Sequence, residues 1–361
     1  MSKLEQTPPK RIDLQAYEQY KARNIFVLGV LFVSLILIGL LSLRAGSYDM
    51  SLVEIAKAVF GKAADSKVNT VIQNMRLPRV LTAVIGGFGL GISGCVLQAI
   101  LRNPLASAST LGISQGASFG AAFAIIVLGA GAQGSTVASM KFSNPLLISF
   151  CAFICSMGVS VIILALSRFK KITPEAMVLA GVALSAMFQG ATTLLQFFAN
   201  EVQLASVVFW TFGDLGRTGW KEVRLMAVVV LAAALYFLFS RWNYNALESG
   251  EQTAVSLGVN VNRVRIINMV LCSITAAIVV SYIGIINFIG LVAPHIVRRF
   301  IGNNHHYLLP CSALMGAILL LLGDLAARMV ISPVILPIGA ITSFLGAPLF
   351  LYLLFKGGGR K

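Results

Sequence analysis

The stretch Gly284-Ile-Ile-Asn-Phe-Ile-Gly-Leu-Val-Ala-Pro-His-Ile-Val-Arg-Arg299 decides the fold class of this chain. It begins as an apolar segment, contains glycine and proline, and ends with a histidine and two arginines. A break inside an apolar helix is tolerated in lipid only where neighbouring groups satisfy the freed backbone. Arginine is enriched at the cytoplasmic end of membrane helices. The stretch therefore predicts an interrupted membrane helix that reaches the cytoplasmic surface.

The rest of the chain has the composition of a polytopic membrane protein. Of its 361 residues, 57% are hydrophobic and 11% are charged, whereas soluble domains have roughly 25% charged residues. The formal net charge of +15 would suggest nucleic acid as a partner of a soluble protein. Here the basic residues form short clusters between apolar runs, which is typical of a membrane topology signal. We therefore expect contact with membrane lipid and no nucleic-acid partner.

Ten apolar segments are candidates for membrane helices, each of which needs about 20 mostly apolar residues. They comprise residues 25–43, 79–101, 109–130, 146–167, 176–199, 225–241, 266–283, 285–300, 308–327 and 337–355. We expect an all-α, multi-pass protein in which residues 25–356 form one membrane domain. Residues 1–24 and 357–361 are predicted to be cytoplasmic tails, because most Lys and Arg residues then lie on the cytoplasmic side.

The sequence argues against an active site on this chain. It contains no Gly-x-x-x-x-Gly-Lys-Ser/Thr segment, so it has no Walker A loop for ATP. Its five cysteines lie inside apolar runs, where small packing residues are the expected reading. No metal-ligand spacing, nucleophile elbow or carboxylate pair occurs. We expect no catalytic residue, no metal site and no cofactor bound by this chain.

Two polar segments interrupt the apolar pattern. Residues 246–258 predict a short amphipathic helix that ends at Gly258, too short to span a membrane. It would either lie on lipid or dock on a partner. The span 176–199 carries Gln189, Thr192, Thr193 and Gln196, and polar groups in a membrane helix usually face protein or a cavity. These groups would either line a path or form hydrogen bonds between helices.

Ten short motifs, found in order over about residues 70–356, resemble the FecCD-type permeases of ABC importers, the family of vitamin B12 and iron-siderophore permeases. The motifs are Arg76-Leu-Pro-Arg79; Gly94 with Gln98; Arg102-Asn-Pro-Leu-Ala106; Leu111-Gly-Ile-Ser-Gln-Gly-Ala117; Leu179-Ala-Gly-Val-Ala183; Ala254 with Leu257-Gly258; Phe288-Ile-Gly-Leu-Val-Ala-Pro-His295; Leu308-Leu-Pro310; Asp324 with Arg328; and Pro337-Ile-Gly339 with Gly346-Ala-Pro348. No single motif is specific, but their order is.

The resemblance implies a type II ABC importer permease with ten helices, in the plasma (inner) membrane of a prokaryote. It implies a second permease chain, identical or a paralogue, around a central path. It also implies an external substrate-binding protein and two ABC ATPase subunits on the cytoplasmic side. The ATPase subunits would use ATP and Mg²⁺, so the chain itself would not be an enzyme.

The resemblance also implies roles for particular residues. Arg76, Arg79 and Arg328 match positions that meet acidic residues of the binding protein, and arginine pairs bidentately with carboxylates. Anchoring to lipid phosphate, or for Arg328 an i,i+4 pair with Asp324, is the structural alternative.

On the cytoplasmic side the resemblance implies a coupling element and a path. Glu251, Ala254, Leu257 and Gly258 match the helix that sits in a groove of the ATPase. Thr173 and Pro174 match a cytoplasmic gate, and the candidates for the path are Gln189, Thr193 and Gln196.

Two classes of function follow. The first is an ABC importer permease for a metal chelate such as an iron-siderophore, with vitamin B12 or heme as alternatives. The second is an ion-coupled secondary carrier, which usually needs an ionisable residue near the bilayer midplane. Only Asp324 lies inside an apolar run, and it lies near the end of that run beside Arg328. The sequence therefore favours the importer.

Overall fold

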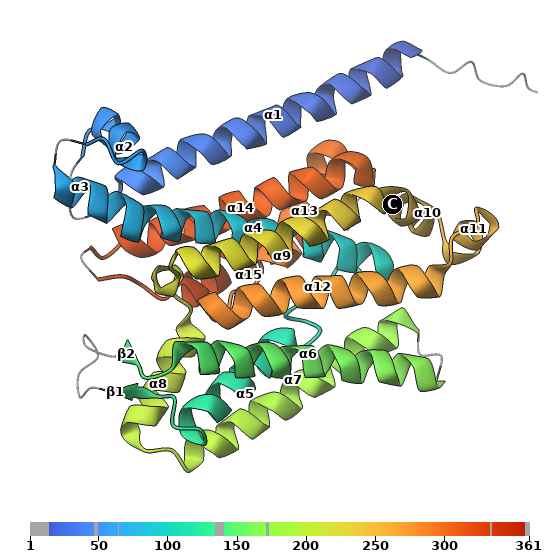
Figure 1. The fold of residues 1–361 in the computed structure, drawn as a ribbon. Coiled ribbons are helices and arrows are strands. Elements are labelled where there is room, and N and C mark those ends of the chain that lie inside the picture. The colour runs from blue at the N-terminus through green and yellow to red at the C-terminus, as the bar shows by residue number, and fades with distance from the viewer. Residues whose placement is uncertain are drawn as a thin grey trace, which may run out of the picture.

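The computed structural model describes residues 14–46, 50–63, 65–133, 141–170, 173–332 and 334–357 as an all-α bundle (Figure 1). Its helices are α1 (Leu14–Arg44), α2 (Leu52–Val59), α3 (Ser66–Val71), α4 (Leu77–Ile100), α5 (Ile113–Ile126), α6 (Pro145–Lys170), α7 (Pro174–Phe197), α8 (Glu201–Phe212), α9 (Trp220–Phe239), α10 (Arg241–Glu248), α11 (Glu251–Ser256), α12 (Val261–Ile283), α13 (Ile289–Ile301), α14 (His305–Met329) and α15 (Ile338–Gly357). A π-helical turn, η1 (Ile72–Arg76), leads into α4, and a 3-10 turn, η3 (Leu215–Arg217), follows α8. The short strands β1 (Ala132–Gln133) and β2 (Lys141–Phe142) pair antiparallel.

Each of the predicted spans contains one long or intermediate helix, in chain order α1, α4, α5, α6, α7, α9, α12, α13, α14 and α15. In the described part of the chain, seven helical segments are long and apolar enough to cross a membrane. The helices α5, α8 and α15 are shorter and apolar. The predicted N-terminal tail is helical from Leu14 onward, and residues 1–13 and 358–361 of the two predicted tails lie outside the described residues.

The stretch 284–299, from which the fold class was predicted, is interrupted at its beginning. Gly284 (φ +81) and Phe288 (φ +65) adopt left-handed backbone conformations, so α12 ends at Ile283 and α13 begins at Ile289. Pro294 lies inside α13. The predicted span 285–300 is therefore wrong at its start, because a helix cannot continue through left-handed residues.

The segment 200–224, which lies between two of the predicted spans, contains the helix α8. Asn200 and Gln203 form a capping box at the start of α8, in which each side chain accepts a hydrogen bond from the other residue's backbone N–H, at 2.9 and 3.1 Å. This reciprocal cap satisfies two of the N–H groups that a helix start leaves free. The cap was readable in the sequence, but the segment was too short to suggest a span.

Glycines let α4 occupy the centre of the bundle, against α9, α12, α13 and α14. A methyl group added at Gly87 or Gly91 would overlap backbone oxygens of α14, and one at Gly94 would overlap the carbonyl oxygen of Gly290 at the start of α13. Gly87, Gly91 and Gly94 are therefore positions of close helix packing. Small residues have this role in membrane bundles because they let backbones approach.

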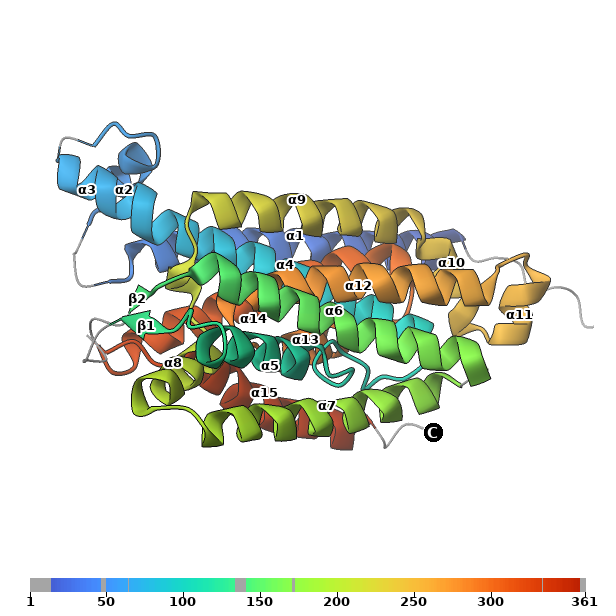
Figure 2. The same cartoon turned by 60° about the horizontal axis from the view of Figure 1, so that its bottom comes forward.

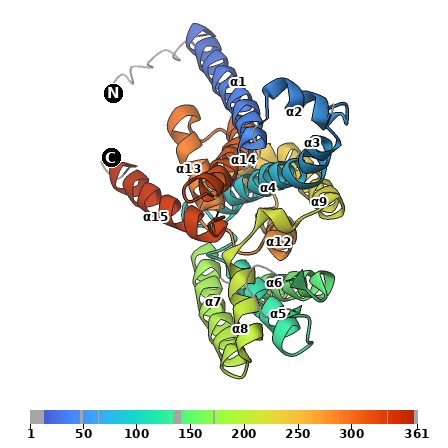
Figure 3. The same cartoon turned by 90° about the vertical axis from the view of Figure 1, so that its left-hand side faces the viewer.

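The bundle has two distinct ends and two distinct sides. Figures 1 and 2 show α2, α3, β1 and β2 at one end, named the α2 end here, and α10 and α11 at the other, named the α11 end. Viewed along the bundle, α7 and α15 lie on the side opposite to α6 and α9, with α12 between α6 and α9 (Figure 3). Candidate functional groups lie at both ends and on α7.

Candidate functional site

The α11 element lies at one end of the bundle, between α10 and α12. The predicted single helix over residues 246–258 is wrong, because α10 ends at Glu248 and Gly250 has φ +118. The predicted end is confirmed, since α11 stops at Ser256 and Gly258 has φ +83. A glycine in such a conformation commonly follows a helix C-terminus, because it has no Cβ to clash.

One edge of α11 is buried against the bundle and the other is exposed. Ala254 is fully buried, whereas Val255 and Leu257 are 61% and 68% exposed. An exposed apolar edge of this kind is suited to contact with lipid or with a partner. The predicted coupling residues Glu251, Ala254, Leu257 and Gly258 therefore form one compact element, of which only part is open to a partner.

Arg265 connects this element to the centre of the bundle. From α12 its Nη2 donates to the Glu251 carboxylate at the start of α11. Its Nε donates to the carbonyl oxygen of Ile100, the last residue of α4, at 3.2 Å. Its side chain is only 11% exposed. No local signal in the sequence pointed from Arg265 to Glu251 or to Ile100.

The α2 end holds a buried ionic cluster. Asp324 of α14 is fully buried and lies between two arginines. Arg79 Nε donates to Asp324 Oδ1 at 2.8 Å, and Arg328 Nε donates to Oδ2 at 3.0 Å. Asp214, which precedes η3, lies 3.7 Å from Arg79 Nη1 and is 42% exposed. The i,i+4 pair of Asp324 and Arg328 considered from the sequence is present.

The arginines of this end also hold the last turn of α1. Arg328 Nη1 donates to the Ala45 carbonyl at 2.9 Å, and its Nη2 donates to the Ser42 carbonyl at 3.2 Å. Arg76 Nη1 donates to the Leu43 carbonyl at 2.8 Å. The three arginines predicted to face a binding protein therefore have internal acceptors, and their docking role stays a prediction.

The polar residues of α7 do not gather into a buried site. The Thr192 hydroxyl is buried and donates to the Phe188 carbonyl at 2.8 Å, and that of Thr193 donates to the Gln189 carbonyl at 3.0 Å. These bonds stay within α7, so they do not link helices. Gln189 and Thr193 are exposed, and Gln196 is half-buried. A role on a path therefore requires a second surface that faces α7.

Much of α7 is apolar and uncovered. It packs on α5 and α6, while Leu179, Leu194 and Phe197 are 69%, 65% and 80% exposed. The helix begins at Pro174, and the Thr173 hydroxyl caps it by accepting a hydrogen bond from the Ala176 N–H at 3.4 Å. Thr173 and Pro174 thus have a helix-starting role, and the predicted gate role is untested.

No metal centre is visible in the part of the chain that the structure describes. Among these residues no group of three or more His, Cys, Asp or Glu is arranged to hold an ion. The His295 ring stacks on Phe350 with centroids 5.7 Å apart, which joins α13 to α15.

Three comparisons relate the chain to known proteins. The model of the FecCD transport family matches residues 34–356. A protein of Methanocaldococcus jannaschii, named as a proposed ABC transporter permease, is 48% identical over 342 residues, which are 95% of this chain and 97% of the relative. The hemin transport system permease protein of Yersinia pestis is 34% identical over 335 residues, which are 91% of this chain and 95% of the relative.

A solved structure has the same fold. It shows an inward-facing conformation of a proposed metal-chelate type ABC transporter, and it superposes with a TM-score of 0.79. The two chains are 32% identical, and the match covers 91% of this chain and 99% of the other.

Proposed function

Because the chain belongs to the FecCD transport family, we propose that it is the permease subunit of an ABC importer. The proposed cargo is a metal chelate, and an iron-siderophore is the first candidate. Heme and vitamin B12 are the alternative cargoes, and hemin is the cargo that the name of the Yersinia pestis relative gives. The observation that carries the proposal is the α11 element, whose apolar edge is exposed while its base is joined to α4 through Arg265.

The α11 end is the proposed cytoplasmic end. Both α1 begins and α15 ends there (Figure 1), and the last turn of α13 carries Arg298 and Arg299. Basic residues favour the cytoplasmic side of a membrane protein. At the α2 end, the positive charges of Arg79 and Arg328 are partly offset by Asp324. Both termini are then cytoplasmic, in the plasma membrane of a prokaryote.

The partners follow from this orientation. Two ABC ATPase subunits, which use ATP and Mg²⁺, would meet α11, and an external binding protein would meet the α2 end. A second permease chain, identical or a paralogue, would cover the exposed face of α7 and place Gln189, Thr193 and Gln196 beside a shared path. This arrangement gives the apolar surface of α7 a protein partner in place of lipid.

An ion-coupled carrier is the second candidate, and the buried cluster argues against it. A coupling residue near the midplane has to gain and lose charge during transport. Asp324 accepts hydrogen bonds from two guanidinium groups, so both of its carboxylate oxygens are already paired within the protein. It therefore fits a fixed ion pair better than a proton or ion relay.

Transport in liposomes tests the proposal. The chain is reconstituted with its candidate ATPase and binding protein, and uptake of labelled ferric siderophore, heme and vitamin B12 is measured side by side. We expect uptake of one cargo that requires ATP, the ATPase and the binding protein. Uptake that continues without the ATPase and follows an ion gradient would establish the carrier instead.

Arg265→Gln is expected to uncouple ATP hydrolysis from uptake. The substitution removes the charged link between α11 and the end of α4, so movement of α11 would reach the centre of the bundle weakly. We expect cargo uptake per ATP hydrolysed to fall about tenfold, which corresponds to about 1.4 kcal/mol and is within the range of one charge-assisted hydrogen bond. The readout is the ratio of uptake to hydrolysis in the same liposomes.

Arg263→Gln is the matched control. Arg263 lies two residues away on α12, is exposed, and has no side-chain bond to α4 or α11 among the described residues. We expect this variant to keep the ratio of the unmodified complex. Equal ratios for the two variants would show that Arg265 does not transmit movement.

A further inference from the structure

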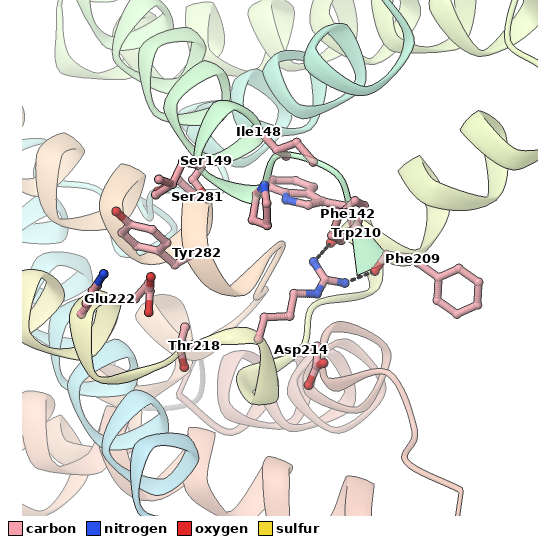
Figure 4. A pocket seen from close by; sticks show the side chains of 14 residues that line it. Phe142, Ile148, Ser149, Phe209, Trp210, Asp214, Thr218, Glu222, Ser281 and Tyr282 are labelled. Atoms are coloured by element: carbon pink, nitrogen blue, oxygen red, sulfur yellow. Dashed lines mark hydrogen bonds between the residues drawn. The ribbon is translucent and has the colours of Figure 1, made fainter. Parts of the chain in front are cut away.

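A cavity of about 630 Å³ lies at the α2 end, beside the ionic cluster. Its walls come from the start of α6, the end of α8, η3, the start of α9 and the end of α12 (Figure 4). The volume lies within the range of small-ligand sites in proteins. No residue of α7 or α15 lines it, so it lies away from the proposed path.

The acidic side chains of the cavity are already engaged. Asp214 Oδ1 accepts a hydrogen bond from the Gly216 N–H at 2.8 Å. Glu222 Oε2 accepts one from the Gly219 N–H at 2.8 Å, which caps the start of α9. Each carboxylate therefore has a structural task in the turn that carries it.

The basic side chains keep unused donors. Arg217 donates to the carbonyl oxygens of Phe209 and Trp210, but a guanidinium has five N–H groups. Burial lowers the pKa of Arg217, since its charge is poorly solvated. Lys221 lines the same cavity, and its side chain has no hydrogen bond or ion pair within the described ranges. Two positively charged donor groups are thus available in the cavity, beside the two carboxylates that cap their own turns.

Apolar surface continues from the cavity along two helices. On α6, Leu146 lines the cavity and is 68% exposed, and Phe150, one turn further, is 63% exposed. On α9, Lys221 shares a helix face with Leu225 and Val228, which are 44% and 67% exposed. Since α12 packs against both helices, this surface suits an acyl chain that extends from a headgroup in the cavity.

We propose that the cavity binds the phosphate headgroup of a membrane phospholipid, with Lys221 and Arg217 as donors and an acyl chain along α6 and α9. Arginine and lysine both form charge-assisted hydrogen bonds to phosphate. The cavity also contains Trp210 and Tyr282, and these residue types are enriched at the level of lipid headgroups. The site is independent of the cargo, since it does not face the proposed path.

Fluorescence of Trp210 tests the site on the full chain. Trp210 lines the cavity, and the other two tryptophans, Trp220 and Trp242, are replaced by Phe. Phosphatidylglycerol with brominated acyl chains is titrated into the detergent-solubilised protein, because bromine quenches a nearby indole. We expect saturable quenching, and Lys221→Glu is expected to raise the half-saturating lipid concentration about tenfold or more, the loss of one charge-assisted hydrogen bond.

The control is Arg224→Glu, one turn further along α9, which makes the same charge change on an exposed residue outside the cavity. It is expected to leave the half-saturating concentration unchanged. Arg217→Lys is a second variant, which keeps the positive charge but loses the several N–H donors of the guanidinium group. It is expected to weaken quenching as well. Lys221→Glu is informative even if Arg217→Lys fails to fold, because Lys221 has no structural partner among the described residues.

Three results would overturn the proposal. Quenching that rises linearly with lipid would show no site, and equal shifts in Lys221→Glu and Arg224→Glu would show only a general charge effect. Inorganic phosphate at millimolar concentration is added in a separate titration. If it displaces the brominated lipid completely, the cavity is a site for free phosphate and not for a phospholipid.

Discussion

Gly94→Ala is expected to destabilise the centre of the bundle more than a glycine-to-alanine substitution at any other position there. A Cβ at this position would overlap the carbonyl oxygen of Gly290, and both partners are backbone, so neither can rotate away. Overpacking usually costs about 1–3 kcal/mol, and a clash between two helix backbones should reach or exceed the upper end. We expect a large fall in the thermal unfolding temperature of the purified protein and a loss of monodisperse material.

Gly158→Ala on α6 is the matched control, because no atom lies within 4 Å of a Cβ built at Gly158. Replacing glycine by alanine inside a helix otherwise favours the helix by roughly 0.5–1 kcal/mol. The control should therefore be as stable as the unmodified chain or slightly more stable. If the two variants unfold at the same temperature, the close approach of α4 to α13 is not required for the fold.

Asp324→Asn is the second substitution with a large expected effect. It keeps the shape of the side chain but leaves Arg79 and Arg328 in the cluster without the carboxylate that both contact. Removing one partner from a buried ion pair costs about 3–5 kcal/mol, because a buried charge is left uncompensated. We expect destabilisation of this size in thermal or denaturant unfolding, together with release of the last turn of α1, which Arg328 holds.

Two further variants make the result specific. Glu18→Gln removes an exposed carboxylate on α1 and is expected to change stability little. Combining Asp324→Asn with Arg328→Gln removes one of the two uncompensated charges, so the double variant should be more stable than the sum of the single effects predicts. Simple additivity would mean that Asp324 and Arg328 do not act as a unit.

The ionic cluster also bears on the expected docking role of the arginines. The sequence pattern placed Arg76, Arg79 and Arg328 among residues for a binding protein. The structure adds that Arg79 joins α4 to Asp324 of α14. Arg76 and Arg328 donate hydrogen bonds to backbone carbonyls at the end of α1. A loss of transport on replacing them would therefore need to be separated from a loss of folding, which the stability of the same variants measures.

Part of the candidate site was readable in the sequence and part was not. The end of α11 at Gly258 was predicted, because a glycine after a short amphipathic run is a local signal. The break at Gly250 was missed, since Ser249 and Gly250 alone do not distinguish a helix interior from a turn. The role of Arg265 was missed for a different reason, because its partner Ile100 is 165 residues away in the chain.

The sequence by itself determined the membrane class, the all-α fold and the approximate positions of ten apolar helices. The physical reason is local: a helix satisfies its own backbone, and the length of an apolar run is set by the thickness of the bilayer. Only the tertiary structure decided which polar groups meet. Arg79 and Asp324 are 245 residues apart in the chain, and they pair because α4 and α14 pack along their glycines, which no local pattern specifies.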